Sequence, residues 1–215
     1  MFASSAFRDS RREPAPNAHG DWKPPFAQNA GRLRPMALTA TLYRFDIDVS
    51  DVDRNVYERL ELRAAQHPSE SMNYLLTRVL AYCLSHEEGI AFSRGLAEPD
   101  EPALLVKDLQ GVTQAWIEVG APAPERLHRA SKAVRRVIIY CHHDVEVLKR
   151  SLRGQKVHRL AEIEVFAVDP AVLAQLEALT ERSNSWSIAR SDGEIYVNVK
   201  DRTLTTRLER IALDQ

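Results

Sequence analysis

Between residues 112 and 181 the chain alternates segments typical of strands with segments typical of helices. Apolar runs of four to eight residues favour buried strands, and proline at the start of a segment favours the first turn of a helix. Parallel strands need such intervening helices as crossovers. The pattern therefore predicts an α/β fold with parallel pairing. We expect strands at 112–119, 137–140 and 161–168, and helices from Pro122 and Pro124 onward, at 144–152 and at 170–181.

Both ends of the globular region read as antiparallel hairpins. Residues 43–49 and 56–64 alternate apolar with polar side chains, the period of a half-buried strand, and a polar loop at 50–55 joins them. Near the carboxyl end, Asp192-Gly193 separates two further strand-like runs and is a strong signal for a tight hairpin turn. We therefore expect a mixed sheet with antiparallel hairpins at its edges.

A helix is predicted after Pro68, with Ser69 as its N-cap and Gly89 at its end. The amino-terminal residues 1–35 differ from this region, because they are rich in proline and show no apolar periodicity. We expect residues 1–35 to be a disordered tail and residues 36–215 to form a single domain.

Composition fits one ordinary core, since 44% of the 215 residues are hydrophobic and 27% are charged. No apolar run approaches the roughly 18 residues that a membrane helix requires, and charges occupy the place of a signal peptide's apolar stretch. Cys83 and Cys141 each sit in apolar runs without a second cysteine at metal spacing, which favours core thiols. We expect a cytoplasmic protein with no membrane partner.

Charge is distributed unevenly along the chain. Acidic residues outnumber basic ones between residues 36 and 122, whereas Lys and Arg dominate residues 123–160. A basic segment opposite an acidic one suits a protein that holds a phosphate backbone on one side and a cation on the other. Segment 123–160 is thus a possible nucleic-acid contact; the alternative is that these charges only solvate helix faces.

Two acidic residues stand out around the strand at 112–119. Asp108 precedes the Gln110-Gly111 turn, and Glu118 interrupts an apolar run in which a carboxylate is costly unless it is paired or metal-bound. Together they could bind one Mg²⁺ or Mn²⁺, which suits phosphodiester hydrolysis. The alternative for Glu118 is a salt bridge to one of the arginines.

Other candidates have structural explanations of equal or greater weight. Glu70 could be a ligand or simply a first-turn acid favoured by the helix dipole. Arg78 could contact phosphate or an intramolecular partner. His142-His143 could bind metal, although adjacent residues of an extended strand point to opposite faces.

Several blocks in order carry a family resemblance. They are the opening Met36-Ala-Leu-Thr-Ala-Thr-Leu-Tyr-Arg-Phe, then His67-Pro-Ser-Glu70, Arg94-Gly-Leu96, Asp100-Glu-Pro102 and Trp116-Ile-Glu-Val-Gly120 followed by Pro122. Over about residues 36–213 the chain resembles the YaeQ family. The resemblance implies a restriction-endonuclease-like, PD-(D/E)XK-type αβββαβ core, and a family with no established reaction.

The PD-(D/E)XK scheme uses a helix Glu, an Asp and a Glu-x-Lys on the next strand. The resemblance places Glu70, Asp108 and Glu118 in the acidic slots, with Asp108 and Glu118 as metal ligands. Gly120 stands in the lysine slot, so Lys132 on the following helix is the candidate replacement. The expectation is a magnesium-dependent nuclease, a hydrolase acting on nucleic acid; the alternative is a non-catalytic nucleic-acid- or protein-binding module on a degenerate nuclease scaffold.

Overall fold

The computed structural model describes residues 40–93 and 100–213, so the expected tail at 1–35 lies outside the described residues. Every described element belongs to one compact unit, Leu38–Gln215. Its described strands form two sheets, one of five strands and one of six, here called sheet A and sheet B.

Sheet A begins with the expected amino-terminal hairpin. β1 and β2 pair antiparallel, with buried Ile47 opposite Leu60, as the alternating pattern predicted. The second expected hairpin also forms, and Asp192 and Gly193 turn between its strands with positive φ. β8 pairs in parallel with β1, although the two strands are far apart in the sequence. In the order β10-β9-β8-β1-β2, the strands span Arg202–Arg207, Glu194–Val199, Ser183–Ser191, Thr41–Asp51 and Val56–Gln66.

Sheet B contains the alternating strands and helices of the middle of the chain. β5, β6 and β7 are parallel to one another, while β4 and β11 pair antiparallel at either side and β3 extends the β4 edge. In the order β11-β7-β6-β5-β4-β3, the strands span Glu209–Ile211, Glu164–Ala167, Arg136–Cys141, Thr113–Val119, Leu104–Lys107 and Ile90–Phe92.

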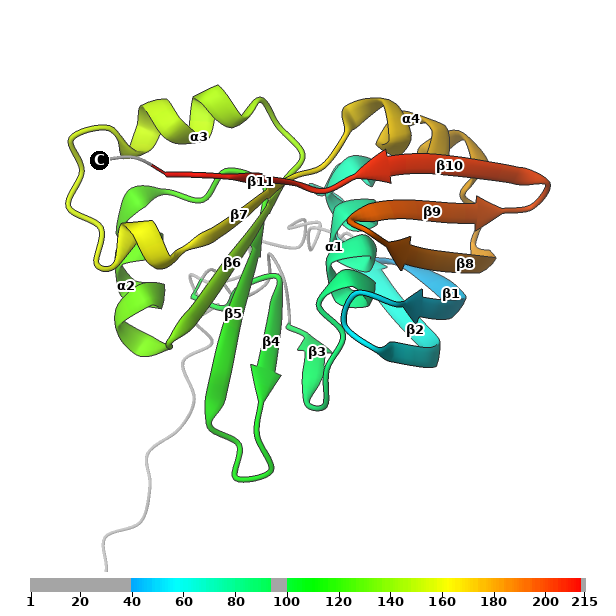
Figure 1. Cartoon of the computed structure of the whole chain (residues 1–215), viewed down its shortest axis with the longest axis horizontal. Coiled ribbons are helices and arrows are strands. Elements are labelled where there is room, and N and C mark those ends of the chain that lie inside the picture. Colours follow the sequence, from blue (N-terminus) through cyan, green and yellow to red (C-terminus); the bar gives the residue numbers. More distant parts are fainter. Residues whose placement is uncertain (1–39, 94–99, 214–215) are drawn as a thin grey trace, which may run out of the picture. The chain divides into compact units, whose positions relative to one another are not determined.

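Four α-helices cover the sheets in the described part of the chain. α1 lies between sheets A and B (Figure 1), and its buried side chains join the larger core, which also includes α4 and the inner face of sheet A. α2 and α3 cover the other face of sheet B around a second, smaller core. The helices α1 to α4 span Met72–Leu84, Pro124–Ala133, Val145–Leu152 and Pro170–Leu179, and a short 3₁₀ turn spans Leu160–Glu162.

The fold is therefore the mixed α/β type expected, with parallel strands in the centre of sheet B and antiparallel hairpins in sheet A. Cys83 and Cys141 are buried free thiols, as their apolar surroundings predicted. Among the described helices, none has the length and apolar content needed to cross a membrane.

Candidate functional site

Glu118 lies near the carboxyl end of β5 and is only 3% exposed. Its Oε1 accepts hydrogen bonds from Trp116 Nε1 at 2.6 Å and from Arg126 Nε at 2.5 Å. Arg126 also donates to the Glu101 carbonyl, and its guanidinium carbon lies 5.8 Å from the Trp116 ring centroid. The arrangement is thus the intramolecular ion pair that was the alternative to a metal ligand.

Arg126, rather than Lys132, is the cation that lies beside Glu118. α2 begins at Pro124 soon after β5 ends, so a residue in its first turn can reach back to the strand. Lys132 lies six residues further along the helix, roughly 9 Å along its axis, and is exposed to solvent. The expected approach of Lys132 to Glu118 is not observed.

The backbone at position 120, where the resemblance led us to look for a lysine, favours glycine. Gly120 has φ +90°, a conformation that residues with a side chain rarely adopt, and its amide donates to the Tyr140 carbonyl at 2.9 Å. The chain turns there to leave β5. A lysine at this position would strain the turn.

Asp108 lies in the turn between β4 and β5, at the opposite end of β5 from Glu118. Its Oδ1 accepts hydrogen bonds from the Gln110 and Val112 amides, and its Oδ2 accepts one from the Gln114 side chain. The Val112 amide is the main cause of its lowered pKa. The part of β5 from Thr113 to Glu118 already covers a separation of five residues, which corresponds to about 16 Å along the strand.

Asp108 and Glu118 are therefore not brought together, and they do not fit a shared Mg²⁺ or Mn²⁺ site. The Asp108 carboxylate stabilises the β4–β5 turn instead. Among the residues the structure describes, no cluster of three or more His, Cys, Asp or Glu side chains could hold a metal ion.

Glu70 is buried. It lies just before the N-cap of α1, because the N-cap is Ser71 and not the expected Ser69. Its Oε1 accepts a hydrogen bond from Arg78 at 2.8 Å and its Oε2 accepts one from the His67 amide at 3.1 Å. Arg78 also donates to the Ala65 carbonyl. The first-turn explanation of Glu70 is thus wrong, and Arg78 has the intramolecular partner that was its alternative role.

The pKa of Tyr74 on α1 depends on the charges of both ion pairs, Glu70–Arg78 and Glu118–Arg126. Burial raises the pKa of its hydroxyl, and the Glu70 and Glu118 carboxylates add to the rise while Arg78 and Arg126 oppose it. The Glu70 and Glu118 carboxylates are thus both within electrostatic reach of the Tyr74 phenol.

His142 and His143 follow β6 directly and do not point to opposite faces as expected. Their ring centroids are 4.1 Å apart, because the extended strand ends at Cys141 and no longer imposes its alternation. His142 is 7% exposed, and its Nδ1 has no hydrogen-bond partner in the described structure. Burial, assisted by the His143 charge, lowers the pKa of His142 to about 4, so its imidazole is neutral at pH 7.

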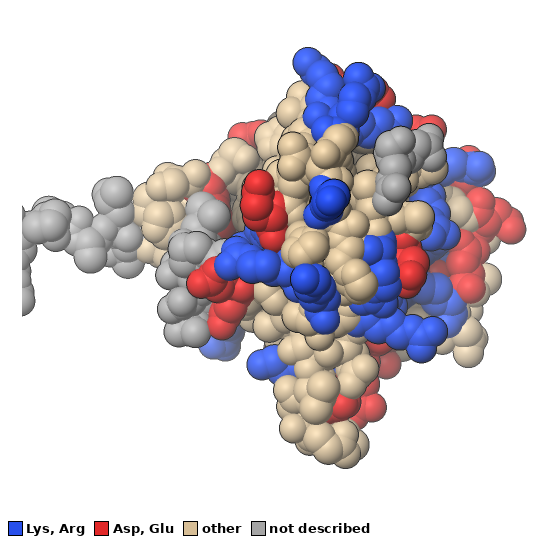
Figure 2. Space-filling model, turned by 90° about the vertical axis from the view of Figure 1, so that its left-hand side faces the viewer, with Lys and Arg blue, Asp and Glu red and all other residues tan. Residues whose placement is uncertain are grey.

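Four cations of the basic segment 123–160 lie on α2 and on the connections that follow α2 and α3, and together they are here called the basic face. Its defining members are exposed and have no ion pair or side-chain hydrogen bond among the described residues. They are Lys132, Arg135, Arg153 and Lys156. Figure 2 shows this side of the molecule, where Lys and Arg side chains form several patches with Asp and Glu side chains among them.

Direct contacts hold the two parts of the basic face together. His128 on α2 hydrogen-bonds the Lys156 carbonyl at 2.9 Å. Arg159 donates to the carbonyls of Ser131 and Val134 at the end of α2. The flanking cations Arg129 and Lys149, by contrast, pair with acidic side chains.

A family model described as "YaeQ protein" matches residues 36–208. The chain belongs to the YaeQ family. It is 31% identical over 175 residues to "Uncharacterized protein YaeQ" of Escherichia coli K12, a match that covers 80% of this chain and 96% of that protein. The same figures apply to the protein of that description from Salmonella typhi.

Two crystal structures of YaeQ proteins share the fold. The protein from Pseudomonas syringae superimposes with a TM-score of 0.73 at 30% identity, covering 80% of this chain and 96% of that one. The protein from Xanthomonas axonopodis pv. citri superimposes with a TM-score of 0.75 at 28% identity, covering 82% of this chain and 100% of that one.

Sequence reasoning on this YaeQ-family chain did not single out two residues that act on or near Glu118. A salt bridge to one of the arginines was an open alternative for Glu118, and the position of Arg126 in the first turn after a buried carboxylate was a usable signal for the partner. Tyr74 comes from a helix more than forty residues upstream, and no local pattern connects it with Glu118.

Proposed function

We propose that this YaeQ-family protein binds nucleic acid through the basic face. The observation that carries the proposal is the set of four exposed cations that have no acidic partner among the described residues. Cations that merely solvate a helix face are commonly balanced by nearby carboxylates, as Arg129 is by Asp100. Unbalanced cations on one surface attract a phosphate backbone and release its counterions.

The geometry favours contacts to phosphates over contacts to bases. Lys132 and Arg135 come from the end of α2 and the turn after it, while Arg153 and Lys156 come from the connection after α3. Long side chains from two segments tied together by hydrogen bonds can follow a backbone without reading base edges. We therefore expect binding with little sequence preference.

Wild-type protein should bind short duplex and single-stranded oligonucleotides of unrelated sequence with similar affinity. Four phosphate contacts correspond to a slope of roughly −3.6 for log K against log salt with duplex DNA. Fluorescence anisotropy at several salt concentrations measures this slope. Binding that is unaffected by salt, or an absence of binding at low salt, would reject the proposal.

A second candidate is a metal-dependent phosphodiesterase with Mg²⁺ or Mn²⁺. This candidate is supported by the element order α1-β3-β4-β5-α2-β6, the order that an αβββαβ core would have, and by the position of Glu118 near the carboxyl end of β5. Glu118 Oε2, unlike Oε1, has no hydrogen bond within the described structure. A divalent ion can be held by one carboxylate and several waters, so this oxygen is a possible ligand.

Manganese titration of thermal stability separates this candidate from simple binding. If Glu118 is a ligand, Mn²⁺ should raise the Tm of the wild type and of Asp108→Asn, but not of Glu118→Gln. Asp108→Asn is the matched control because its carboxylate lies at the other end of β5. Equal shifts in all three proteins would remove Glu118 as a ligand.

A further inference from the structure

The outer face of sheet A carries like charges opposite each other. In the β1–β2 register, Arg44 stands opposite Arg63, and Asp46 stands opposite Glu61. Directly opposed side chains have Cβ atoms about 5 Å apart, and like charges in such pairs destabilise a sheet. This face therefore holds two repulsive pairs. The Arg44–Arg63 pair is here called the basic row, and the Asp46–Glu61 pair is called the acidic row.

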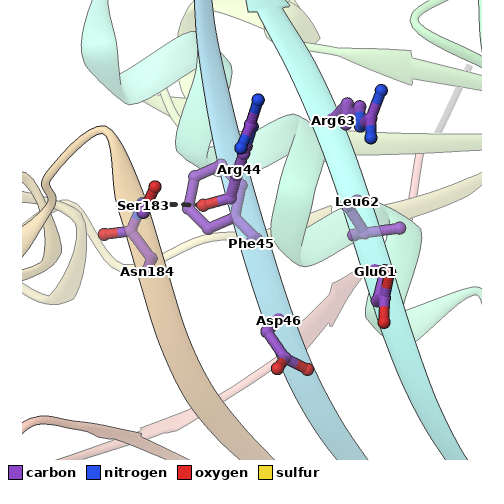
Figure 3. Close-up of a pocket in the computed structure, with 8 residues that line it drawn as sticks. All are labelled: Arg44, Phe45, Asp46, Glu61, Leu62, Arg63, Ser183 and Asn184. Atoms are coloured by element: carbon purple, nitrogen blue, oxygen red, sulfur yellow. Dashed lines mark hydrogen bonds between the residues drawn. The ribbon is translucent and has the colours of Figure 1, made fainter.

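Only the acidic row receives a compensating charge. Arg59 on β2 donates to both oxygens of Asp46, at 3.1 Å and 2.7 Å. Neither guanidinium of the basic row has an ion pair or a hydrogen bond among the described residues. Figure 3 shows the Arg44 and Arg63 side chains at one end of a shared pocket, with Asp46 and Glu61 at the other end.

The pocket has a volume of about 300 Å³, at the lower limit for sites that bind small ligands. Ser183 lies beside Arg44 in the parallel β1–β8 register, so the pocket spans three strands. Asn184 donates to the carbonyls of Arg44 and Glu181, which fixes this end of β8. The unpaired arginines thus stand in a rigid sheet and not on a loop.

We propose that Arg44 and Arg63 bind the phosphate group of a small phosphorylated ligand. A tetrahedral phosphate offers enough oxygens for both guanidinium groups and for the Ser183 hydroxyl. Binding would replace the Arg44–Arg63 repulsion with attraction. The site belongs to sheet A and is separate from the basic face on α2 and α3.

The acidic row disfavours an extended polyanion that runs along β2. Glu61 and Arg63 point to the same side of β2 and are two residues apart, about 6.6 Å. A nucleic-acid strand that placed one phosphate on the arginines would bring further negative charge toward Asp46 and Glu61 if it ran along β2. A single phosphate whose remaining atoms are neutral or cationic avoids that repulsion.

The test measures Tm in inorganic phosphate and in glycerol phosphate, against sodium chloride of equal ionic strength. For a ligand at ten times its Kd, the wild-type Tm should rise by about 3–6 °C. Arg44→Gln and Arg63→Gln should each lose most of this rise. Arg202→Gln should keep it, because it removes the same charge from sheet A, while β9 separates β10 from the three strands that line the pocket.

Two results would overturn the proposal. The first is a phosphate-specific Tm shift that is absent from the wild type or unchanged in both arginine variants. The second is a Tm rise in a single-stranded oligonucleotide that is lost in Arg44→Gln and Arg63→Gln and occurs at lower phosphate-equivalent concentration than with glycerol phosphate, which would assign the arginines to a polyanion instead.

Discussion

Replacing Arg78 by Met should lower the free energy of unfolding by about 3–5 kcal/mol, because it leaves the buried Glu70 carboxylate without its cation. The Arg78 and Glu70 side chains are only 4% and 1% exposed. Arg78 also packs near the Tyr74 and Phe92 rings, at 5.9 Å and 5.4 Å from their centroids. Methionine retains part of this packing, so the lost charge accounts for most of the effect.

Urea denaturation at pH 7 measures this change, with Arg59→Met as the matched control. Arg59 also pairs with a carboxylate, but the Arg59 and Asp46 side chains are 67% and 42% exposed, and such pairs contribute about 0–1 kcal/mol. The double variant Glu70→Gln, Arg78→Met should recover much of the stability, since no unpaired charge remains buried. A loss below about 1 kcal/mol for Arg78→Met would contradict the structural role of the pair.

Local patterns predicted most of the strands and helices of this fold. The alternation at 43–49 and the Asp192-Gly193 turn each act within a few residues, and both hairpins formed where expected. The parallel pairing of β1 with β8 joins segments about 140 residues apart, and no local sequence pattern indicates that these two strands pair. The division into two sheets with α1 between them was therefore not predicted.

The candidate site was predicted in part. Glu118 was recognisable because a carboxylate within an apolar strand needs a partner, and it has one in Arg126. Asp108 was grouped with Glu118 by closeness in sequence, but an extended strand separates residues that a helix would keep close. Lys132 was selected to fill the lysine slot, whereas the distance along α2 favours a residue of its first turn.

The central claim is that the basic face binds nucleic acid, and its most direct test changes four charges at once. Substituting Gln at the four residues of the basic face should weaken oligonucleotide binding by about 10²–10³-fold near 100 mM salt and bring the salt slope close to zero. The control variant removes four positive charges from sheet A and its turns. Its substitutions to Gln are at Arg59, Arg182, Lys200 and Arg202.

Anisotropy titrations of both variants against one oligonucleotide decide the matter. Because their net charges are equal, a difference between them reports the location of the binding surface and not overall attraction. The account predicts that the basic-face variant loses affinity and salt dependence while the control variant keeps both within about threefold. Equal losses in the two variants, or retained affinity in the basic-face variant, would contradict it.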